Sequence, residues 1–474
     1  AALSAGSDPY LDDHVYHGER LFPAVMGLEA MAQVVMALTE SDSVPRFEHV
    51  KLSRPVVVPR QGSLRLRLAA LIREDGDVDV VLRTSETGFQ IDHFSARCPW
   101  IPAGRGLAAL AEDAVAAARP DLQAPPLDLD PRTDLYGDLF FHTGRFQRVL
   151  NYRLLRACEC LVQLEADADV SWFSQYLPAD RVLGDTGVRD AAIHAIQACI
   201  PHARLLPVSV GRITVGRLPC LFREVGREGR RPVLLLHASE TSRQGDAYHY
   251  DLQLLTEKGV VLEAWEDLCL RKVDDLPRRT PWILPLLGPY LERRLEELLP
   301  GTNMRVALVQ GKDEDRRAAS QQVIQSALGE PLPVRYRPDG KPEVSGGWNV
   351  SAAHAASLAL GVAAPNGEKI GCDLEKVVSR TPMVWHDLLG PARYEFAALM
   401  AKEADEPIDQ AATRVWAGLE CLKKAGGILA APFTLERKTA DGWVAFRAGA
   451  MRIASCAVTV RGWTEPFIAS FLTV

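Results

Sequence analysis

Apolar residues recur at every third or fourth position from Leu21 to Thr39, which is the spacing of one buried helix face. Pro23 stands where the first turn of a helix tolerates a proline. After this helix the pattern changes to an alternation of apolar and polar residues, which predicts antiparallel strands. The strand-like stretches are residues 56–58, 64–68 and 78–82. One hydrophobic helix followed by several strands predicts a sheet wrapped around that helix.

The same order of patterns returns later in the chain. A strand-like stretch at 149–165 precedes a helical stretch at 188–199, and strand patterns follow near 206–215, 231–238, 248–255 and 260–270. Residues 103–132, rich in Ala, Pro, Asp and Leu, are expected to connect the two parts. The sequence therefore predicts a domain at 1–275 with two halves, 1–102 and 131–275, each a sheet around its own long helix.

A proline-rich stretch after residue 276 marks a change in organisation. A short amphipathic helix is expected at 291–299, and we place a linker at 276–300. From residue 301 to 474, strand and helix patterns alternate, beginning with a strand at 304–309 and a helix at 316–328. This alternation predicts a second domain of the α/β type, in a chain that is α+β as a whole.

The composition narrows the possible function classes. The chain has 474 residues, more than one hydrophobic core usually supports, and its net charge of −7 gives no general attraction to nucleic acids or anionic membranes. Nine dispersed cysteines without metal-binding spacing indicate reduced thiols in a cytoplasmic protein. There is no signal-like opening and no apolar run of about 18 residues, so neither secretion nor membrane insertion is expected. The abrupt start at Ala1 suits a fragment of a longer polypeptide.

Two separated segments form the first candidate site. His14, Gly18 and Pro23 follow the spacing H-x3-G-x4-P, and Asp190 with His194 follows D-x3-H. A histidine, whose ordinary pKa is about 6.5, can accept a proton at neutral pH. A carboxyl group serves as the acid only when burial raises its pKa, and the apolar neighbours of Asp190 favour burial against the opposing helix dipole. The segments therefore indicate a base and an acid that could together eliminate water.

These segments resemble the dehydratase domains of polyketide synthases. The resemblance implies a double hotdog fold, in which two antiparallel sheets each wrap a long helix, and the dehydration of 3-hydroxyacyl thioesters to 2-enoyl thioesters. It makes His14 the base and Asp190 the acid, with a backbone N–H near Gly18 polarising the thioester carbonyl and His194 holding Asp190. A further family segment, Y-G-P-x-F-Q, corresponds only loosely to residues 142–147, where the Tyr and Pro are missing.

A second candidate site lies in the last third of the chain. Asp373 and Glu375 stand at i and i+2 of an expected strand and share a face, while Glu420 and Lys424 share a helix face at i and i+4. A few carboxylates together with water and phosphate oxygens suit Mg²⁺. The three carboxylates are therefore a candidate Mg²⁺ site. The simpler interpretation is that they form ordinary salt bridges with nearby basic residues.

The segments Gly371-Cys372-Asp373-Leu374-Glu375 and Trp416-x3-Glu420-x3-Lys424 resemble the signature of phosphopantetheinyl transferases. The resemblance implies that Asp373, Glu375 and Glu420 hold Mg²⁺ and that Glu420 deprotonates the serine of an acyl carrier protein. The donor implied is coenzyme A, with expected contacts at Arg316, Arg317, Lys341, Pro342, Ser351, His354 and Lys424.

In this order the two domains are similar to the carboxyl end of an iterative type I (enediyne) polyketide synthase. The partners implied are the acyl carrier protein and other domains of the same megasynthase, with no nucleic acid and no membrane, and a homodimer is the default because such dehydratases are often paired. Three alternatives stay open for the first site. They are a hotdog thioesterase that uses a carboxylate to activate water, a non-catalytic scaffold that docks carrier proteins, and an ordinary surface histidine at position 14.

Overall fold

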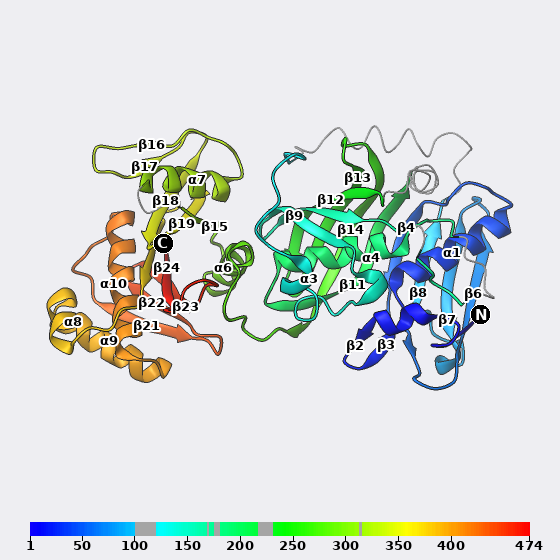
Figure 1. The fold of residues 1–474 in the computed structure, drawn as a ribbon, viewed down its shortest axis with the longest axis horizontal. Helices are drawn as coiled ribbons and strands as arrows, with labels where there is room; N and C mark the ends of the chain where they lie inside the picture. The colour runs from blue at the N-terminus through cyan, green and yellow to red at the C-terminus, as the bar shows by residue number, and fades with distance from the viewer. Residues whose placement is uncertain (100–119, 168–169, 175–180, 217–230, 312–314) are drawn as a thin grey trace. The chain divides into compact units, whose positions relative to one another are not determined.

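The structure is a computed structural model that describes residues 1–99, 120–167, 170–174, 181–216, 231–311 and 315–474. The chain divides into two compact units, Ala1–Leu276 and Pro277–Val474 (Figure 1). Most of the connection predicted at 103–132 lies outside the described residues. No helix in the described part of the chain is long and apolar enough to cross a membrane.

The first half of the first unit is built around α1 (Ala24–Thr39), the helix that the apolar spacing predicts. Pro23 caps its start, and Gly27 allows close packing, since a Cβ there would lie 2.4 Å from the ring of Phe94. The strands of this half are β1 (Ala2–Leu3), β4 (Phe47–Leu52), β6 (Leu64–Ile72), β7 (Val78–Thr84) and β8 (Phe94–Cys98). A small separate sheet contains β2 (Val15–Tyr16), β3 (Glu19–Leu21) and β5 (Val57–Val58), and short 3-10 helices lie at Pro9–Asp13 and Ser85–Thr87.

The second half repeats this plan around α4 (Thr186–His194), which continues as a 3-10 helix over Ala195–Cys199. The side chain of Asp185 caps α4 by accepting the N–H of Gly187 at 2.8 Å. All nine residues of α4 are buried, so the helix lies in the core. The other elements are α3 (Pro131–Asp134), a 3-10 turn at Gly144–Phe146, β9 (Val149–Leu155), β10 (Glu159–Glu165), β11 (Ala203–Val215), β12 (Val233–Gln244), β13 (Ala247–Thr256) and β14 (Val261–Asp275).

The two halves share one sheet, which corrects the prediction of two separate sheets. Strands β4 and β11 pair in antiparallel fashion, with Val50 opposite Val210. The result is an 11-stranded sheet in the order β1-β6-β7-β8-β4-β11-β14-β13-β12-β10-β9. The alternation of side chains along a strand specifies which face is buried but not which strand is its neighbour. The fold is a double hotdog in which the two half-sheets are joined edge to edge.

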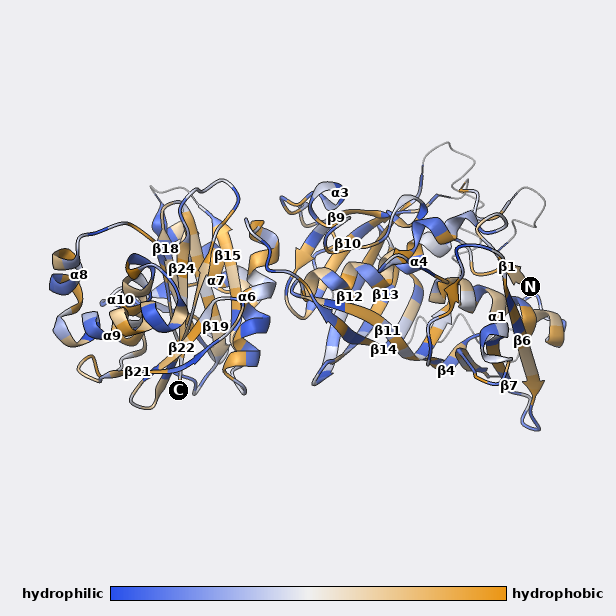
Figure 2. Ribbon diagram, turned by 90° about the horizontal axis from the view of Figure 1, so that it is seen from below, coloured by the Kyte–Doolittle hydropathy of each residue, from blue (hydrophilic) through white to orange (hydrophobic). Residues whose placement is uncertain are grey.

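The second unit contains two antiparallel sheets with helices. The first has the order β15-β19-β18 and the second β20-β24-β23-β22-β21. The α/β prediction is therefore wrong for this unit, which is α+β; local alternation of helix and strand patterns does not reveal strand direction. Figure 2 shows that the strands around β15 and β24 are largely hydrophobic. The bounds are β15 (Arg305–Gln310), α7 (Arg316–Leu328), β16 (Arg335–Tyr336), β17 (Pro342–Glu343), β18 (Trp348–Ala355), β19 (Leu358–Pro365), β20 (Gly371–Lys376), α8 (Pro382–Leu389), α9 (Pro391–Ala404), α10 (Ile408–Ala425), β21 (Phe433–Lys438), β22 (Trp443–Ala448), β23 (Met451–Val458) and β24 (Phe467–Thr473).

The stretch predicted as a linker contains α6 (Leu284–Leu298), which begins earlier than the expected amphipathic helix and belongs to the second unit. Its Glu292 accepts the backbone N–H of Val306 at 2.8 Å, and Tyr290 accepts the indole N–H of Trp443 at 3.0 Å. Arg294 also binds the carboxylate of Asp441. These contacts attach α6 to β15 and to the turn before β22.

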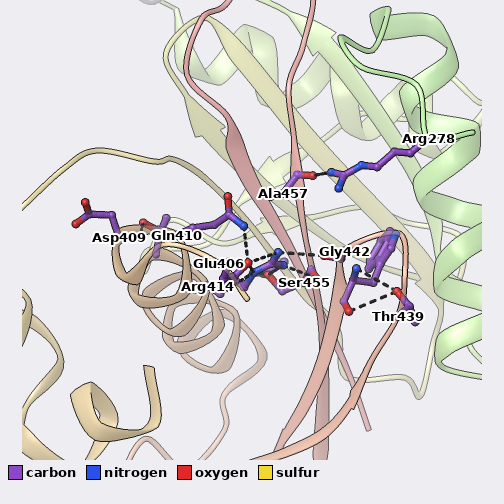
Figure 3. A network of polar contacts seen from close by, with 12 residues as sticks. Arg278, Glu406, Asp409, Gln410, Arg414, Thr439, Gly442, Ser455 and Ala457 are labelled. Carbon is purple, nitrogen blue, oxygen red and sulfur yellow. Dashed lines mark hydrogen bonds and ion pairs between the residues drawn. The ribbon is translucent and has the colours of Figure 1, made fainter. Parts of the chain in front are cut away.

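Helix α10 is fixed to the sheet by a buried arginine. Arg414 donates to the carboxylate of Glu406 from Nε at 3.0 Å, to the carbonyl of Ser455 at 2.7 Å and to the carbonyl of Gly442 at 3.0 Å (Figure 3). The Arg414 side chain is 1% exposed and that of Glu406 is 7% exposed. Because α10 carries the second motif, this network determines where the motif lies relative to β20 to β24.

Candidate active site

His14 lies at the end of the 3-10 helix Pro9–Asp13, directly before β2. Its Nδ1 is 2.9 Å from the carbonyl of Leu21, and a carbonyl can only accept, so Nδ1 carries the proton. In the neutral ring Nε2 therefore has a free lone pair, and this atom is 3.7 Å from Oδ1 of Asp190. Burial lowers the pKa of His14 below its ordinary value, although the charge of Asp190 opposes this. His14 is thus a neutral base aimed at Asp190.

Asp190 lies in the second turn of α4 and is 6% exposed. Its Oδ2 is 3.1 Å from Nε2 of His142 and 3.2 Å from Nδ1 of His194. Burial would raise the pKa of Asp190, but the surrounding histidines lower it below its ordinary value. His142 contributes through its charge and a hydrogen bond, His194 through a hydrogen bond and His14 through its charge. This result corrects the expectation that burial would dominate. Asp190 is buried as expected, and the imidazoles of His14, His142 and His194 lie next to its carboxylate.

His142 is the site residue that the sequence analysis missed. Its ring stacks on that of His194, with centroids 4.0 Å apart, and its Nδ1 is buried without a hydrogen-bond partner. Burial lowers the pKa of His142 to about 3, and the charge of His194 adds to this. Position 142 is where the family segment Y-G-P-x-F-Q has its tyrosine. The signal was present in the divergent segment, where a histidine stands in place of that tyrosine.

His194 lies where the resemblance implies, one turn after Asp190. Because its Nδ1–H donates to the carboxylate of Asp190, its Nε2 accepts a hydrogen bond, and the Tyr136 hydroxyl lies 3.2 Å away. Tyr136 in turn accepts the backbone N–H of Val149 at 3.2 Å. A buried chain from Val149 through Tyr136 and His194 therefore fixes the orientation of the Asp190 carboxylate.

Gly18 does not reach this cluster in the structure. It lies in the exposed turn between β2 and β3 with φ of +77°, a conformation that favours glycine, and its carbonyl accepts from Arg60 at 3.0 Å. It is not among the described residues that line the cavity beside His14. The implied role in carbonyl polarisation is therefore not supported by this geometry, and the turn itself accounts for the glycine.

A cavity of about 70 Å³ opens beside the acid and the base. Aromatic and aliphatic side chains make up most of its wall, and Arg204 contributes the one guanidinium among the described lining residues. Such a wall keeps water away from a reacting group and strengthens electrostatic interactions there. The lining residues are His14, Ala24, Leu139, Phe140, Phe141, His142, Asp190, Ile193, His194, Gln197, Arg204, Leu205, Leu206, Pro207 and Leu270.

In the second unit, Asp373 and Glu375 lie on β20 as expected, and Lys424 reaches them from α10. Lys424 Nζ donates to Oδ1 of Asp373 and to the carbonyl of Cys372, both at 2.8 Å. Oδ2 of Asp373 is buried without a hydrogen-bond partner, and Glu375 accepts the indole N–H of Trp416 at 3.1 Å. Burial raises the pKa of Asp373 and of Glu375 above their ordinary values.

The three carboxylates of this motif do not converge in the structure. Glu420 forms an ion pair with Lys423 on its own helix. Within the described ranges, the group of His, Cys, Asp and Glu ligand atoms that lie within 4.8 Å of one another is in the first unit, not here. The sequence predicted a shared helix face for Glu420 and Lys424 but could not predict that Glu420 would turn to Lys423. The three carboxylates are therefore not within 4.8 Å of one another in this structure, and their joint binding of Mg²⁺ stays a prediction.

The residues nevertheless have properties that suit Mg²⁺. Carboxylate oxygens are its preferred protein ligands, and Oδ2 of Asp373 is a buried acceptor that lacks a partner. The raised pKa values of Asp373 and Glu375 mean that burial disfavours their negative charges, which a cation would stabilise. Asp373 and Glu375 therefore fit a divalent cation, whereas Glu420 is paired with Lys423 in this structure.

A second cavity of about 700 Å³ adjoins Lys424. Among the expected coenzyme A contacts, Lys341, Pro342, Ser351 and Lys424 line it. Arg316, Arg317 and His354 are not among its described lining residues. His354 contacts the hydroxyl of Ser320 at 3.2 Å, and Arg317 lies 5.6 Å from the ring of Tyr336. The structure thus gathers four of the seven expected contacts.

Two family models match the first unit. Residues 1–85 match the model described as "Polyketide synthase dehydratase domain", and residues 113–280 match "Polyketide synthase dehydratase N-terminal domain". A curated relative is one of the polyunsaturated fatty acid synthase proteins of Thraustochytrium sp. (strain ATCC 26185 / S-3). It is 26% identical over 152 residues, which are 31% of this chain and 5% of the relative. This chain therefore covers only a small part of that relative.

Solved dehydratase structures are similar at low identity. The dehydratase domain from the CurJ module of curacin polyketide synthase is 14% identical, covers 58% of this chain and 90% of its own, and has a TM-score of 0.43. A dehydratase from the borrelidin and fluvirucin polyketide synthases is 18% identical, covers 59% and 89%, and has a TM-score of 0.41. The family models, not these structures, identify the first unit as a polyketide synthase dehydratase domain. The matched residues end at 280.

Proposed function

We propose that the first unit, as a polyketide synthase dehydratase domain, removes water from 3-hydroxyacyl thioesters to give 2-enoyl thioesters. One observation supports the proposal: Nε2 of His14, with its free lone pair, is 3.7 Å from Oδ1 of Asp190, and both residues line a cavity whose wall is mostly apolar. An elimination needs a base for the α-proton and an acid for the hydroxyl on neighbouring carbon atoms. A pair of groups at this separation provides both.

In this reaction, His14 Nε2 accepts the α-proton of the thioester, and the electron pair of the broken C–H bond forms the new double bond. The C–O bond at the β-carbon breaks, and Asp190 Oδ1 gives its proton to the departing hydroxyl, which leaves as water. His14 is then protonated and Asp190 is ionised. Since the two atoms are 3.7 Å apart, one proton transfer from Nε2 to Oδ1 restores the starting state.

The two other histidines decide which oxygen of Asp190 carries the proton. His142 and His194 both lie at hydrogen-bond distance from Oδ2, so Oδ1 is left for the acidic proton. They also lower the pKa of Asp190, as described above, so the form with a proton on Asp190 and none on His14 is the less populated one. Reaching that form adds to the barrier.

The test is a dehydration assay on a 3-hydroxyacyl pantetheine thioester, with the enoyl and free-acid products separated by mass spectrometry. His14→Ala and Asp190→Asn should each lower the rate by about 10²- to 10⁴-fold, the usual contribution of a general acid or base. His17→Ala is the matched control, because the His17 side chain is 67% exposed. Free acid as the main product would favour the thioesterase, and a wild type as slow as His14→Ala would favour the docking scaffold.

For the second unit we propose transfer of 4′-phosphopantetheine from coenzyme A to the serine of an acyl carrier protein. Two observations favour it. Asp373 presents an unpartnered buried oxygen next to Glu375. A cavity of about 700 Å³ adjoins Lys424, and its lining contains both acidic and basic residues, with Lys341 and Lys424 among the basic ones. A donor with anionic phosphate groups and a divalent cation would satisfy both features.

In that reaction, Asp373, Glu375 and Glu420 would hold Mg²⁺, which would supply charge stabilisation for the departing adenosine 3′,5′-bisphosphate. Lys341 and Lys424 bind phosphate oxygens by charge. The serine oxygen forms a new P–O bond to the phosphorus on the pantetheine side of coenzyme A, the P–O bond to the bisphosphate breaks, and Glu420 accepts the serine proton. The Lys424 ammonium now bound to Asp373 is the group that changes partner when phosphate enters.

The test is incubation of an apo carrier protein with coenzyme A and Mg²⁺, followed by intact-mass measurement. Glu420→Ala and Asp373→Asn should abolish the phosphopantetheine mass gain. Glu465→Ala is a suitable control, since Glu465 belongs to a surface ion pair with Lys376 in the same unit. No mass gain with the wild type and several carrier proteins would overturn this part of the proposal.

Together the two activities suit the carboxyl end of an iterative type I polyketide synthase of the enediyne class. The acyl carrier protein and the other domains of the same synthase are the proposed partners, in the cytoplasm, and the chain is proposed to form a homodimer. Phosphopantetheinylation of a carrier in the same polypeptide, measured at several protein concentrations, tests this context. A rate independent of concentration indicates transfer within one synthase, and a rate proportional to it indicates transfer between molecules.

A further inference from the structure

His14, His142 and Asp190 form a cluster with the composition of a metal site. One atom from each residue lies within 4.8 Å of the other two, and all three residues are buried. Oxygen and nitrogen ligands of one tetrahedral zinc ion are about 3.3 Å apart when each bond is about 2.0 Å long. Nε2 of His14 is 3.7 Å from Oδ1 of Asp190, and Nε2 of His142 is 3.1 Å from Oδ2 of the same carboxylate, so the two distances lie on either side of this value.

The hydrogen bonds around the cluster prepare its atoms for a cation. The Leu21 carbonyl holds the proton of His14 on Nδ1, so the Nε2 lone pair and the Asp190 oxygen face each other as two acceptors. In His142, Nδ1 has no partner, so moving the ring proton from Nε2 to Nδ1 breaks no hydrogen bond at Nδ1. The two imidazole nitrogens and one oxygen of the Asp190 carboxylate, which lie within 4.8 Å of one another, can therefore all offer lone pairs to a cation.

The surroundings match those of metal ligands. Metal-binding imidazoles usually donate their second N–H to a carbonyl or carboxylate, as His14 does to Leu21. The Asp190 carboxylate is oriented by His194, which in turn contacts Tyr136. Within the described part of the chain, the ion pairs of Asp190 are with histidines and not with a lysine or arginine. The carboxylate thus has no permanent positive partner.

We propose that His14, His142 and Asp190 bind one divalent transition-metal ion of the zinc type, and that the bound ion stops dehydration by occupying the lone pair of His14 Nε2. Two imidazoles and one carboxylate select zinc, cobalt or nickel over Mg²⁺, which prefers oxygen ligands. The adjoining cavity leaves a further position for water. The inhibition rests on the proposed dehydratase function, whereas the binding does not.

The binding test uses the whole chain, stripped of metal with a chelator and kept in excess Mg²⁺ so that oxygen-rich sites are filled. Zn²⁺ affinity is measured by competition with a chromophoric chelator, and Co²⁺ is followed by its visible absorption. His142→Phe should lower Zn²⁺ affinity by about 100-fold or more, because it removes a direct ligand and even an outer contact costs 10- to 100-fold. His249→Phe, a histidine paired with Asp267 outside the cluster, should bind as the wild type does.

Two further measurements keep the outcome decisive. His142→Asn retains a polar side chain, and circular dichroism identifies any variant that fails to fold. Equal Zn²⁺ affinity in wild type, His142→Phe and His142→Asn would overturn the site. The dehydration assay is then run on wild type with Zn²⁺ and with chelator; inhibition that chelator reverses, and that begins at the Zn²⁺ concentration at which the cluster binds the ion, supports the inhibitory role. Undiminished activity at saturating Zn²⁺ overturns that role, while no activity in chelator refutes the dehydratase and leaves the binding result standing.

Discussion

Replacing Arg414 by methionine removes the guanidinium that joins α10 to the sheet of the second unit while keeping an unbranched side chain. The change deletes the hydrogen bonds to Glu406, Ser455 and Gly442 shown in Figure 3. Glu406 is left as a carboxylate whose side chain is 7% exposed, with Gln410 as its neighbouring donor. Breaking a buried ion pair in this way usually costs about 3 to 5 kcal/mol. The stability of the second unit should fall by this amount.

The appropriate assay is hydrogen exchange of α10 backbone amides in the whole chain, because it reports the opening of one unit separately from the other. A loss of 3 to 5 kcal/mol corresponds to faster exchange by about 100- to 5,000-fold. Arg447→Met is the matched control. Arg447 pairs with Glu436 on the surface, where its side chain is 49% exposed, and such pairs contribute about 0 to 1 kcal/mol.

The double variant Arg414→Met with Glu406→Gln separates the orphaned charge from the lost hydrogen bonds. A neutral amide at position 406 needs no counter-charge, so the double variant should regain about 0.5 to 3 kcal/mol relative to Arg414→Met alone. Two results would refute the reasoning. One is an Arg414→Met loss no larger than that of Arg447→Met, and the other is a double variant less stable than Arg414→Met.

Three further predictions follow from individual contacts. Tyr136→Phe removes the partner of the buried backbone N–H of Val149 and of Nε2 of His194. The free energy of unfolding of the first unit should fall by about 1 to 3 kcal/mol, as denaturant titration would measure. Burial raises the pKa of Cys372 to about 11, so iodoacetamide at pH 8 should alkylate it only after unfolding, as peptide mapping would detect. Burial alone would raise the pKa of Asp441, but hydrogen bonds and the Arg294 guanidinium lower it below its ordinary value. The contribution of Asp441 to stability is therefore complete above the unfolded pKa of about 3.9 and disappears as the pH falls through the lower folded pKa. Asp441→Asn should lower the free energy of unfolding by about 1.5 to 3 kcal/mol at pH 7 and by much less near pH 2. Thermal melting at both pH values measures the difference.

The fold of the first unit could be predicted largely from local patterns. The helical spacing after Leu21 corresponds to α1, and the helix expected at 188–199 corresponds to α4 and its 3-10 extension. The joining of the half-sheets could not be predicted, because pairing of β4 with β11 depends on residues about 160 positions apart. In the second unit, the same limitation hid the antiparallel direction of the strands and the packing of α6.

The candidate sites, too, could be predicted only in part from the sequence. The family resemblance predicted that His14, Asp190 and His194 meet, and the structure brings them together. Asp190 and His194 lie on a helix that the sequence predicts, whereas His14 ends a 3-10 helix that it does not. His142 lies in an irregular segment where no periodic pattern applies, and its distance from Asp190 depends on how that segment folds against residues 13 and 14. Glu420 can pair with Lys423 or with Lys424, and in the structure it pairs with Lys423. Helix periodicity alone does not determine which of the two lysines it contacts.

Both proposed activities involve the phosphopantetheine arm of the carrier protein, one by installing it and the other by acting on the thioester that it carries. They can therefore be tested separately. The proposed transferase would install the phosphopantetheine arm that carries the thioester on which the proposed dehydratase acts. A variant such as Asp373→Asn should therefore leave the apo carrier without the arm that holds the carrier-bound substrate, while dehydration of a free pantetheine thioester stays unchanged. Asp190→Asn should block dehydration of the free pantetheine thioester and leave the mass gain of the carrier unchanged. Loss of the free-thioester reaction in Asp373→Asn would show that the second unit supports the first by stabilising it, because the transferase chemistry plays no part in that assay.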